Sequence, residues 1–292
     1  MLATMNANPG QLVFRDVQRR FDRAAKNFDA TDFVHRHTFA GLSERLSPAI
    51  IRPARILDLG CATGSGSSQL AKQYRRARII CFDASLGMLQ LARKKRSRLS
   101  KLVELQGDAR RIPLQDGSVD LVFSNLLLPW VSDLPACLAE VGRVLRKDGV
   151  FAFATFGPQS LDEIRAAWRS LDQDWHANAY PDMHDIGDAL VRAGLRDPVL
   201  DVDYLSVTYR DSDALFQDLT NTGARNSLQN RRKSLTGKQR FGQMRENLLA
   251  RADNGTLSLN LELVYGHAWG GGPRLPEGEF RLDPGSIVQR RR

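Results

Sequence analysis

The sequence predicts an α/β fold with a doubly wound, mainly parallel sheet. Between residues 54 and 170, short apolar runs alternate with helical stretches, which is the pattern of β-α-β units. The apolar runs are nearly continuous, as expected for strands that helices cover on both faces. The first of them leads into a loop of small residues, ILDLGCATGSG at 56–66, where a ligand can approach the backbone closely.

The elements of this sheet follow from the local patterns. Apolar runs predict strands at 54–59, 78–83, 102–106, 119–124 and 149–156. Helical stretches between them fall at 66–74, 85–97, 132–146 and 159–170. Ser85 can cap the helix that it begins, and Ser132 or Asp133 can cap the helix that starts beside them.

The regular alternation of short strands and helices ends after residue 171. Helices are expected at 181–195, 212–222 and 236–252, and strands at 199–209 and 259–269. We expect these two strands to pair antiparallel at the sheet edge, which gives seven strands with the last one antiparallel. The helices between them then form an inserted helical cap at about 211–255.

These patterns divide the chain into three segments. Residues 1–50 look helical and amphipathic, and we expect them to gate the access of substrate. Residues 51–269 form one domain that carries the sheet and the cap. Residues 270–292 are rich in Gly, Pro and Arg, which predicts a mobile basic tail.

Composition and charge narrow the class of protein. The chain is 42% hydrophobic and 26% charged and has neither a long apolar window nor a signal-peptide pattern, so we expect a cytoplasmic globular protein. Its three cysteines form no CxxC pair and its histidines are scattered, which predicts no metal site and no disulfide framework. The net charge of +9 is clustered in runs such as RKKRSR at 93–98. Such runs attract an acidic protein or a nucleic acid, although solvated helix faces explain any single run equally well.

Three kinds of ligand site begin with a glycine-rich loop after a strand. A P-loop requires Lys followed by Ser or Thr after its second glycine, and GSGSS at 64–68 excludes it. A dinucleotide site requires G-x-G-x-x-G, whereas the spacing here is Gly60-x-Ala62-x-Gly64. Asp58, which precedes the first glycine, would repel a pyrophosphate but suits a ligand with an ammonium group.

The segment LDLGCATG resembles the first motif of the class I methyltransferases that use S-adenosylmethionine (SAM), which have a Rossmann-like fold. The family pattern is D-x-G-x-G-x-G, and Ala62 stands at its middle glycine. SAM has an amino-acid head and a sulfonium, so close backbone approach and nearby carboxylates fit its chemistry. The resemblance implies SAM as co-substrate and no metal, with Asp58, Gly60, Ala62 and Gly64 at the cofactor.

Further positions of the family pattern follow along the chain. Asp83 ends the second strand, where a carboxylate can accept hydrogen bonds from the ribose hydroxyls. Asp108 ends the third strand, where the family uses an acid or its neighbour to meet the adenine amino group. The resemblance implies that the fourth strand ends beneath the methyl donor. The resemblance thus implies these cofactor-binding residues: Asp83, Ala84, Met88, Asp108, Ala109, Ser124, Asn125 and Leu126.

Outside this core the chain resembles the malonyl-acyl-carrier-protein O-methyltransferases. The segments that carry the resemblance are FDRAAKNFD, FATFGPQSLDEIRAAW, YPDMHDIGDALVRAGLRDPVLDVDYLSVTY and DLTNTGARNSLQNRRKSLTG, within about residues 15–269. The resemblance implies methylation of the free carboxylate of a malonyl group on an acyl carrier protein, early in biotin synthesis. That carrier is acidic, so the net positive charge of this chain would favour its binding. We expect a monomer, with neither a membrane nor a specific nucleic acid as partner.

A carboxylate acceptor also suggests substrate residues. Because the carboxylate is already ionised at pH 7, the reaction needs alignment and desolvation rather than a general base. Candidates to hold it are Arg23, Asn226, Arg231 and Arg232. Candidates to line the acyl pocket are Phe28, Trp130, Phe156 and Tyr180. Phe28 is a departure, since the malonyl-acyl-carrier-protein family usually has tyrosine at this position.

Three other functions compete with this interpretation. The same segments resemble the complex I assembly factor that hydroxylates an arginine, although we find no iron-binding triad such as HxD with a distal His. The charge suggests a nucleic-acid methyltransferase, but the fourth strand ends in SNLLLPW rather than the N/D-P-P-Y/F of enzymes that methylate a base. A non-catalytic SAM-binding assembly factor is the remaining alternative.

Overall fold

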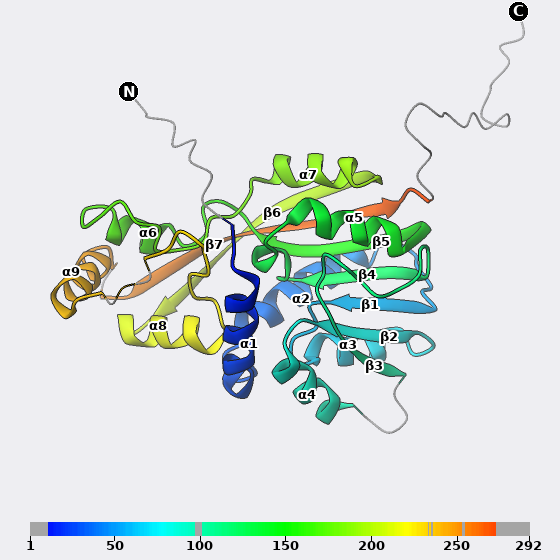
Figure 1. The fold of residues 1–292 in the computed structure, drawn as a ribbon, viewed down its shortest axis with the longest axis horizontal. Coiled ribbons are helices and arrows are strands. Elements are labelled where there is room, and N and C mark those ends of the chain that lie inside the picture. The colour runs from blue at the N-terminus through cyan, green and yellow to red at the C-terminus, as the bar shows by residue number, and fades with distance from the viewer. Residues whose placement is uncertain (1–10, 97–100, 233, 235, 253–254, 273–292) are drawn as a thin grey trace, which may run out of the picture.

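The computed structural model describes residues 11–96, 101–232, 234, 236–252 and 255–272. Within these ranges, seven strands form one sheet in the order β3-β2-β1-β4-β5-β7-β6 (Figure 1). This order confirms the predicted doubly wound α/β fold. The predicted tail at 270–292 lies, from residue 273 onward, outside the described residues.

The first five strands pair in parallel, close to their predicted ranges. They are β1 (Arg55–Leu59), β2 (Arg78–Asp83), β3 (Leu102–Gln106), β4 (Val119–Asn125) and β5 (Leu145–Phe156). Ile56 of β1 joins the core on one face of the sheet, whereas Leu57 and Leu59 join the core on the other face. Because both faces are covered, both sets of alternating residues must be apolar, which explains the nearly continuous apolar runs.

Helices cover both faces of the sheet. One face carries α2 (Phe33–Leu46), α3 (Ser65–Gln73) and α4 (Leu86–Lys95), and the other carries α5 (Leu134–Val144) and α7 (Met183–Arg192). Ser85 caps α4 as predicted, because its hydroxyl accepts a hydrogen bond from the N–H of Met88. Asp133, rather than Ser132, caps α5 in the same way.

The last two strands, β6 (Leu195–Tyr209) and β7 (Leu257–Gly270), form a long antiparallel ribbon. β7 pairs with β5 only from Leu263 to Trp269, so the earlier part of β7 and its partner on β6 extend beyond the sheet (Figure 1). Leucines 257, 259 and 261 of this extension are buried in a core shared with three helices. These helices are α6 (Asp162–Trp168), α8 (Ser212–Asn221) and α9 (Lys238–Leu249).

The N-terminal part of the described chain begins with α1 (Phe14–Phe28), which packs against α4 and α8. A short 3₁₀ helix, Leu128–Trp130, follows β4. None of the helices in the described ranges combines the length and the apolar character that a membrane crossing requires.

The glycine-rich loop after β1 turns through three residues with a left-handed backbone. Gly60, Ala62 and Gly64 have φ angles of 82°, 47° and 77°. Glycine adopts this region freely, whereas the Cβ of an alanine costs roughly 1–2 kcal/mol there. Ala62, which stands at the middle glycine of the family motif, therefore carries strain in the native state.

Ala62→Gly should raise the free energy of unfolding by up to about 1 kcal/mol. The substitution removes the left-handed strain, and the greater freedom of glycine in the unfolded chain offsets only about 0.4–1 kcal/mol of that gain. Chemical denaturation measures the difference. Ala71→Gly, an alanine inside α3, is the matched control and should destabilise by about 1 kcal/mol. Equal destabilisation by both substitutions would contradict the strain at Ala62.

Candidate cofactor and substrate site

Two adjoining cavities lie where the strands of the parallel sheet end. The strand-end cavity is lined by the ends of β2 and β4, the segment after β3, and residues of α1. The loop cavity lies between the glycine-rich loop, the start of α3 and α2. Five residues line both cavities, and we call them the junction: Phe28, His35, Gly60, Ala62 and Asn125. A ligand that fills both cavities must pass this point.

Asp83 is held at the end of β2 by two backbone groups. Its carboxylate accepts hydrogen bonds from the N–H of Ala62 at 3.0 Å and from the N–H of Ser85 at 2.8 Å. Burial nevertheless raises the pKa of Asp83 to about 6, because the two bonds offset only part of the desolvation. The side chain lines the strand-end cavity, and its role as a ligand of the ribose stays a prediction.

Asp58 lies at the floor of the loop cavity and is only 3% exposed. The hydroxyl of Ser67 donates a hydrogen bond to its carboxylate. Burial, with a smaller contribution from the charge of Asp83, raises the pKa of Asp58 to about 7. Two carboxylates with raised pKa values in one site favour a ligand that brings positive charge or hydrogen-bond donors.

Asp108 lines the strand-end cavity, but its carboxylate is engaged by Arg110 at 2.6–3.1 Å. Burial alone would raise the pKa of Asp108, and the hydrogen bonds from Arg110 outweigh it and lower the pKa. Ala109 also lines this cavity. A contact from Asp108 to an adenine amino group would therefore compete with Arg110, whereas Ala109 could offer such a contact only through its backbone.

The other predicted cofactor residues lie in different environments. Ala84 and Leu126 line the strand-end cavity, and Leu126 has a φ of 60°. Met88 is fully buried in the core under α1, and Ser124 is fully buried at the end of β4. Neither Met88 nor Ser124 lines one of the two cavities, so any effect of theirs on a ligand is indirect. Gly64 begins α3 beside the loop.

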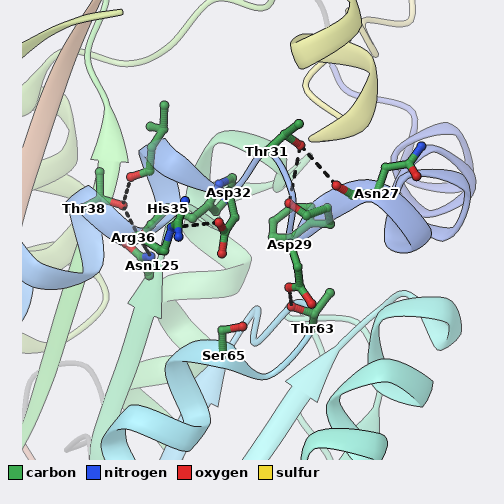
Figure 2. Close-up of polar contacts among 12 residues, drawn as sticks. Asn27, Asp29, Thr31, Asp32, His35, Arg36, Thr38, Thr63, Ser65 and Asn125 are labelled. Atoms are coloured by element: carbon green, nitrogen blue, oxygen red, sulfur yellow. Dashed lines mark hydrogen bonds and ion pairs between the residues drawn. The ribbon is translucent and has the colours of Figure 1, made fainter.

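The N-terminal helices close over this site. The carboxylate of Asp22 on α1 accepts hydrogen bonds from the hydroxyl of Ser85 at 2.6 Å and from the N–H of Gly87 at 3.0 Å. After α1, Asp29 meets Thr63 of the glycine-rich loop (Figure 2). Lys95 of α4 contacts both Asp29 and Thr63. The segment between α1 and α2 is thus fastened to the loop that it covers.

His35, on α2, is a junction residue that the sequence analysis did not select. The amide of Asn125 donates a hydrogen bond to the carbonyl of His35 at 2.9 Å, which places the two residues side by side (Figure 2). The Nδ1 atom of His35 and the Oδ1 atom of Asn125 are buried without a partner among the described residues. Burial lowers the pKa of His35 to about 4, so its imidazole is neutral at pH 7.

A third cavity, which we call the inner cavity, adjoins the junction. It is lined by His35 and by three of the predicted substrate residues, Trp130, Phe156 and Tyr180. The rings of Phe156 and Tyr180 lie 5.4 Å apart. The fourth predicted residue, Phe28, lies at the junction with its ring 4.7 Å from that of His35. The structure therefore brings all four aromatic candidates to one region.

The four candidates for holding the carboxylate lie elsewhere. Asn226, Arg231 and Arg232 line a fourth cavity, the basic cavity, together with Arg20. Asn226 uses its amide group to bond the backbone of Trp175 and Leu228. Arg23 is exposed and lines none of the four cavities. A role for these four residues at the reacting carboxylate stays a prediction.

Comparisons with known proteins identify the fold and the family of this chain. Residues 57–153 match the model of a methyltransferase domain. The YcgJ protein of Bacillus subtilis has the same fold, with a TM-score of 0.58 and 18% identity over 78% of this chain and 97% of that chain. A phosphoethanolamine N-methyltransferase of Haemonchus contortus, solved in complex with SAM, has a TM-score of 0.54 and 17% identity over 90% of this chain and 60% of that chain.

Two curated relatives are similar over almost their whole length. The malonyl-[acyl-carrier protein] O-methyltransferase of Gallionella capsiferriformans is 40% identical over 89% of this chain and 91% of its own. The protein of the same name from Halorhodospira halophila is 37% identical over 99% of this chain and 100% of its own. Together with the fold and the site, these similarities show that the chain belongs to the malonyl-acyl-carrier-protein O-methyltransferases, a family of SAM-dependent methyltransferases.

Proposed function

We propose that this protein transfers the methyl group of SAM to the free carboxylate of a malonyl group carried by an acyl carrier protein. The observation that carries the proposal is the junction. There the two cavities suited to the cofactor meet the aromatic inner cavity, and between them lie polar atoms of His35 and Asn125 that have no partner among the described residues. Donor and acceptor can therefore approach one another at a site shielded by protein.

The residues of the two cofactor cavities fit SAM. Asp83 offers a carboxylate for the ribose hydroxyls in the strand-end cavity. Asp58 offers a carboxylate in the loop cavity, which would hold the ammonium group of SAM. The raised pKa values of both groups show that the protein alone does not satisfy them as anions. SAM supplies a methyl group on a positively charged sulfur, so it needs no metal to be an electrophile.

The chain aligns and desolvates the acceptor. Phe28 and Trp130 are 3% and 7% exposed and exclude water from the region of the junction. The neutral imidazole of His35 can orient a carboxylate there by donating a hydrogen bond from its N–H, and the amide N–H of Asn125 that does not bond to His35 can donate another, whereas Oδ1 of Asn125 can only accept. No general base is required, because a carboxylate carries its negative charge at pH 7. Phe28 provides no hydroxyl where the family usually has tyrosine, so orientation rests on the remaining polar groups.

The partner follows from the same proposal. An acidic carrier protein complements the net charge of +9, and the family relatives favour this acceptor over an arginine or a nucleic acid. The cytoplasmic location and the monomeric state remain predictions, as do the gating role of residues 1–50 and the limits of the helical cap.

Asp83→Asn should weaken SAM binding by about 1.5–3 kcal/mol, the range for a hydrogen bond to a charged group. The amide keeps one acceptor oxygen for the backbone N–H groups but loses the charge and the second acceptor. Isothermal titration calorimetry measures the affinity. Asp188→Asn, at an exposed position on α7, is the control and should bind SAM like the wild type. Unchanged affinity of Asp83→Asn would remove this residue from the cofactor site.

SAM affinity should fall as the pH is lowered from 7 to 5. In the free protein the pKa values of Asp58 and Asp83 are about 7 and 6, so both carboxylates take up protons in this range. A cationic ligand with donor groups favours the ionised forms, and binding must therefore release protons. Calorimetry in buffers of different ionisation enthalpy measures that release. Constant affinity with no proton release from pH 5 to 7 would contradict the assignment.

Label from methyl-labelled SAM should enter malonyl carrier protein and leave acetyl carrier protein unlabelled, because only the malonyl group has a free carboxylate. Mild base should release the label as methanol, since a methyl ester hydrolyses and an N-methyl group does not. Mass spectrometry of the carrier checks the addition of one methyl group. Label that is stable to base, or no label on malonyl carrier protein, would refute carboxyl methylation.

A further inference from the structure

The basic cavity is the largest feature outside the cofactor site that the proposed reaction leaves unexplained. It has a volume of about 290 Å³ and lies among α1, α6, α8 and α9. The described residues that line it include no Asp or Glu. They include four arginines: Arg20, Arg225, Arg231 and Arg232. Aromatic side chains form part of its wall, among them Trp168, Trp175, Phe216 and Phe241.

Arg20 is the least satisfied of these arginines. Its Nη1 atom is buried and has no hydrogen-bond partner in the part of the chain that the structure describes. Burial, followed by the positive charges of Arg231 and Arg225, lowers the pKa of Arg20 to about 10. The guanidinium remains charged at pH 7. A crowded cation with a buried N–H group that has no described partner destabilises the folded protein.

Acidic side chains compensate the positive charge of this arginine cluster only in part. Arg231 forms an ion pair with Asp16 at 2.5 Å, and Arg232 lies 4.0 Å from Asp174. Arg225 is exposed, and no described side chain forms an ion pair with it or with Arg20. The cavity therefore keeps an excess of positive charge around donors that a further anion could occupy.

The basic cavity adjoins the inner cavity, which leads to the junction. Leu161, Leu219 and Ala224 line both the basic and the inner cavity. At its other end the inner cavity shares His35 and Trp130 with the strand-end cavity. Adjoining cavities thus run from the four arginines, through mainly apolar and aromatic walls, to the place where the cofactor and the acceptor carboxylate would meet.

We propose that the basic cavity binds the phosphate of a 4′-phosphopantetheine arm, with Arg20 as its central ligand. The inference rests on the proposed function, in which the acceptor is a malonyl thioester. Such a substrate has an anionic carboxylate at one end of a long, uncharged arm and a phosphate at the other. With the carboxylate at the junction and the arm in the inner cavity, the phosphate meets the arginines. A guanidinium binds phosphate oxygens through two parallel N–H groups, which matches the unused donor of Arg20.

The same phosphate chemistry comes from two sources, a carrier protein and coenzyme A. Both attach the malonyl group through a pantetheine arm that ends in a phosphate. The site should therefore recognise the arm in each. Comparing malonyl carrier protein with malonyl-CoA as methyl acceptors then shows how much the carrier surface adds to recognition of the arm.

The test combines a truncated substrate with a substitution of the ligand. Wild-type protein and Arg20→Gln are each assayed with malonyl-phosphopantetheine and with malonyl-pantetheine, which lacks the phosphate. Loss of a charge-assisted hydrogen bond should raise the KM of the variant for the phosphorylated substrate by roughly tenfold to a hundredfold. The KM for malonyl-pantetheine should be the same in both proteins. Arg15→Gln, an exposed arginine on the same helix, is the control and should behave like the wild type.

Thermal stability provides a second readout. Arg20→Gln removes a crowded charge that forms no ion pair within the described part of the chain, so its Tm without ligand should equal or exceed that of the wild type. Phosphopantetheine itself should raise the Tm of the wild type but not of the variant, whereas pantetheine should raise neither.

Three outcomes would overturn the inference while leaving the proposed function intact. They are an equal KM of the wild type for the two substrates, an equal loss by Arg20→Gln on both, and no effect of phosphopantetheine on the Tm of the wild type. Failure of the wild type to methylate any malonyl substrate would instead refute the proposed function. In that case the Tm measurements still test the phosphate site.

Discussion

The convergence of two backbone N–H groups on the carboxylate of Asp83 determines the geometry of the site. One group belongs to Ala62 in the loop after β1 and the other to Ser85 at the start of α4, so one side chain ties together the loop, β2 and α4. These bonds do not fully replace the water that burial removes, since the pKa of Asp83 stays raised. A ligand that brings hydrogen-bond donors or positive charge would stabilise the ionised carboxylate further. The group that orders the site therefore also favours hydrogen-bond donors and positive charge in a ligand.

The N-terminal helices act on the same elements from outside. Asp22 bonds to Ser85 and Gly87 at the start of α4, and Asp29 bonds to the loop and to Lys95. The ion pair of Asp29 and Lys95 is partly exposed, and such pairs contribute about 1 kcal/mol or less. Helix α1 and the segment that follows it are thus held against the glycine-rich loop and α4 by several weak bonds rather than by one strong bond. Weak bonds of this kind are compatible with the predicted gating role of residues 1–50, which stays a prediction.

The order of strands and helices and the positions of the acidic residues could be predicted from local sequence, because the ends of parallel strands meet at one edge of the sheet. Asp58, Asp83 and Ala109 lie at the cofactor cavities for that reason. His35 and Arg20 could not be predicted. His35 gains its place only when α2 packs over the glycine-rich loop, and in the sequence it is one of five scattered histidines. Arg20 and Arg23 occupy one stretch of α1, and only the packing of that helix decides that Arg20 lines the basic cavity while Arg23 is exposed.

The distribution of charge along the connected cavities is consistent with the chemistry of methyl transfer to a carboxylate. The acceptor loses its negative charge in the transition state, so a cation beside it would stabilise the ground state more than the transition state and slow the reaction. The junction instead presents a neutral imidazole and an amide, at His35 and Asn125. The four arginines lie in the basic cavity, beyond the inner cavity. Charge there contributes binding energy that is the same before and during the reaction. It can therefore hold an anionic substrate without opposing the loss of charge at the reacting end.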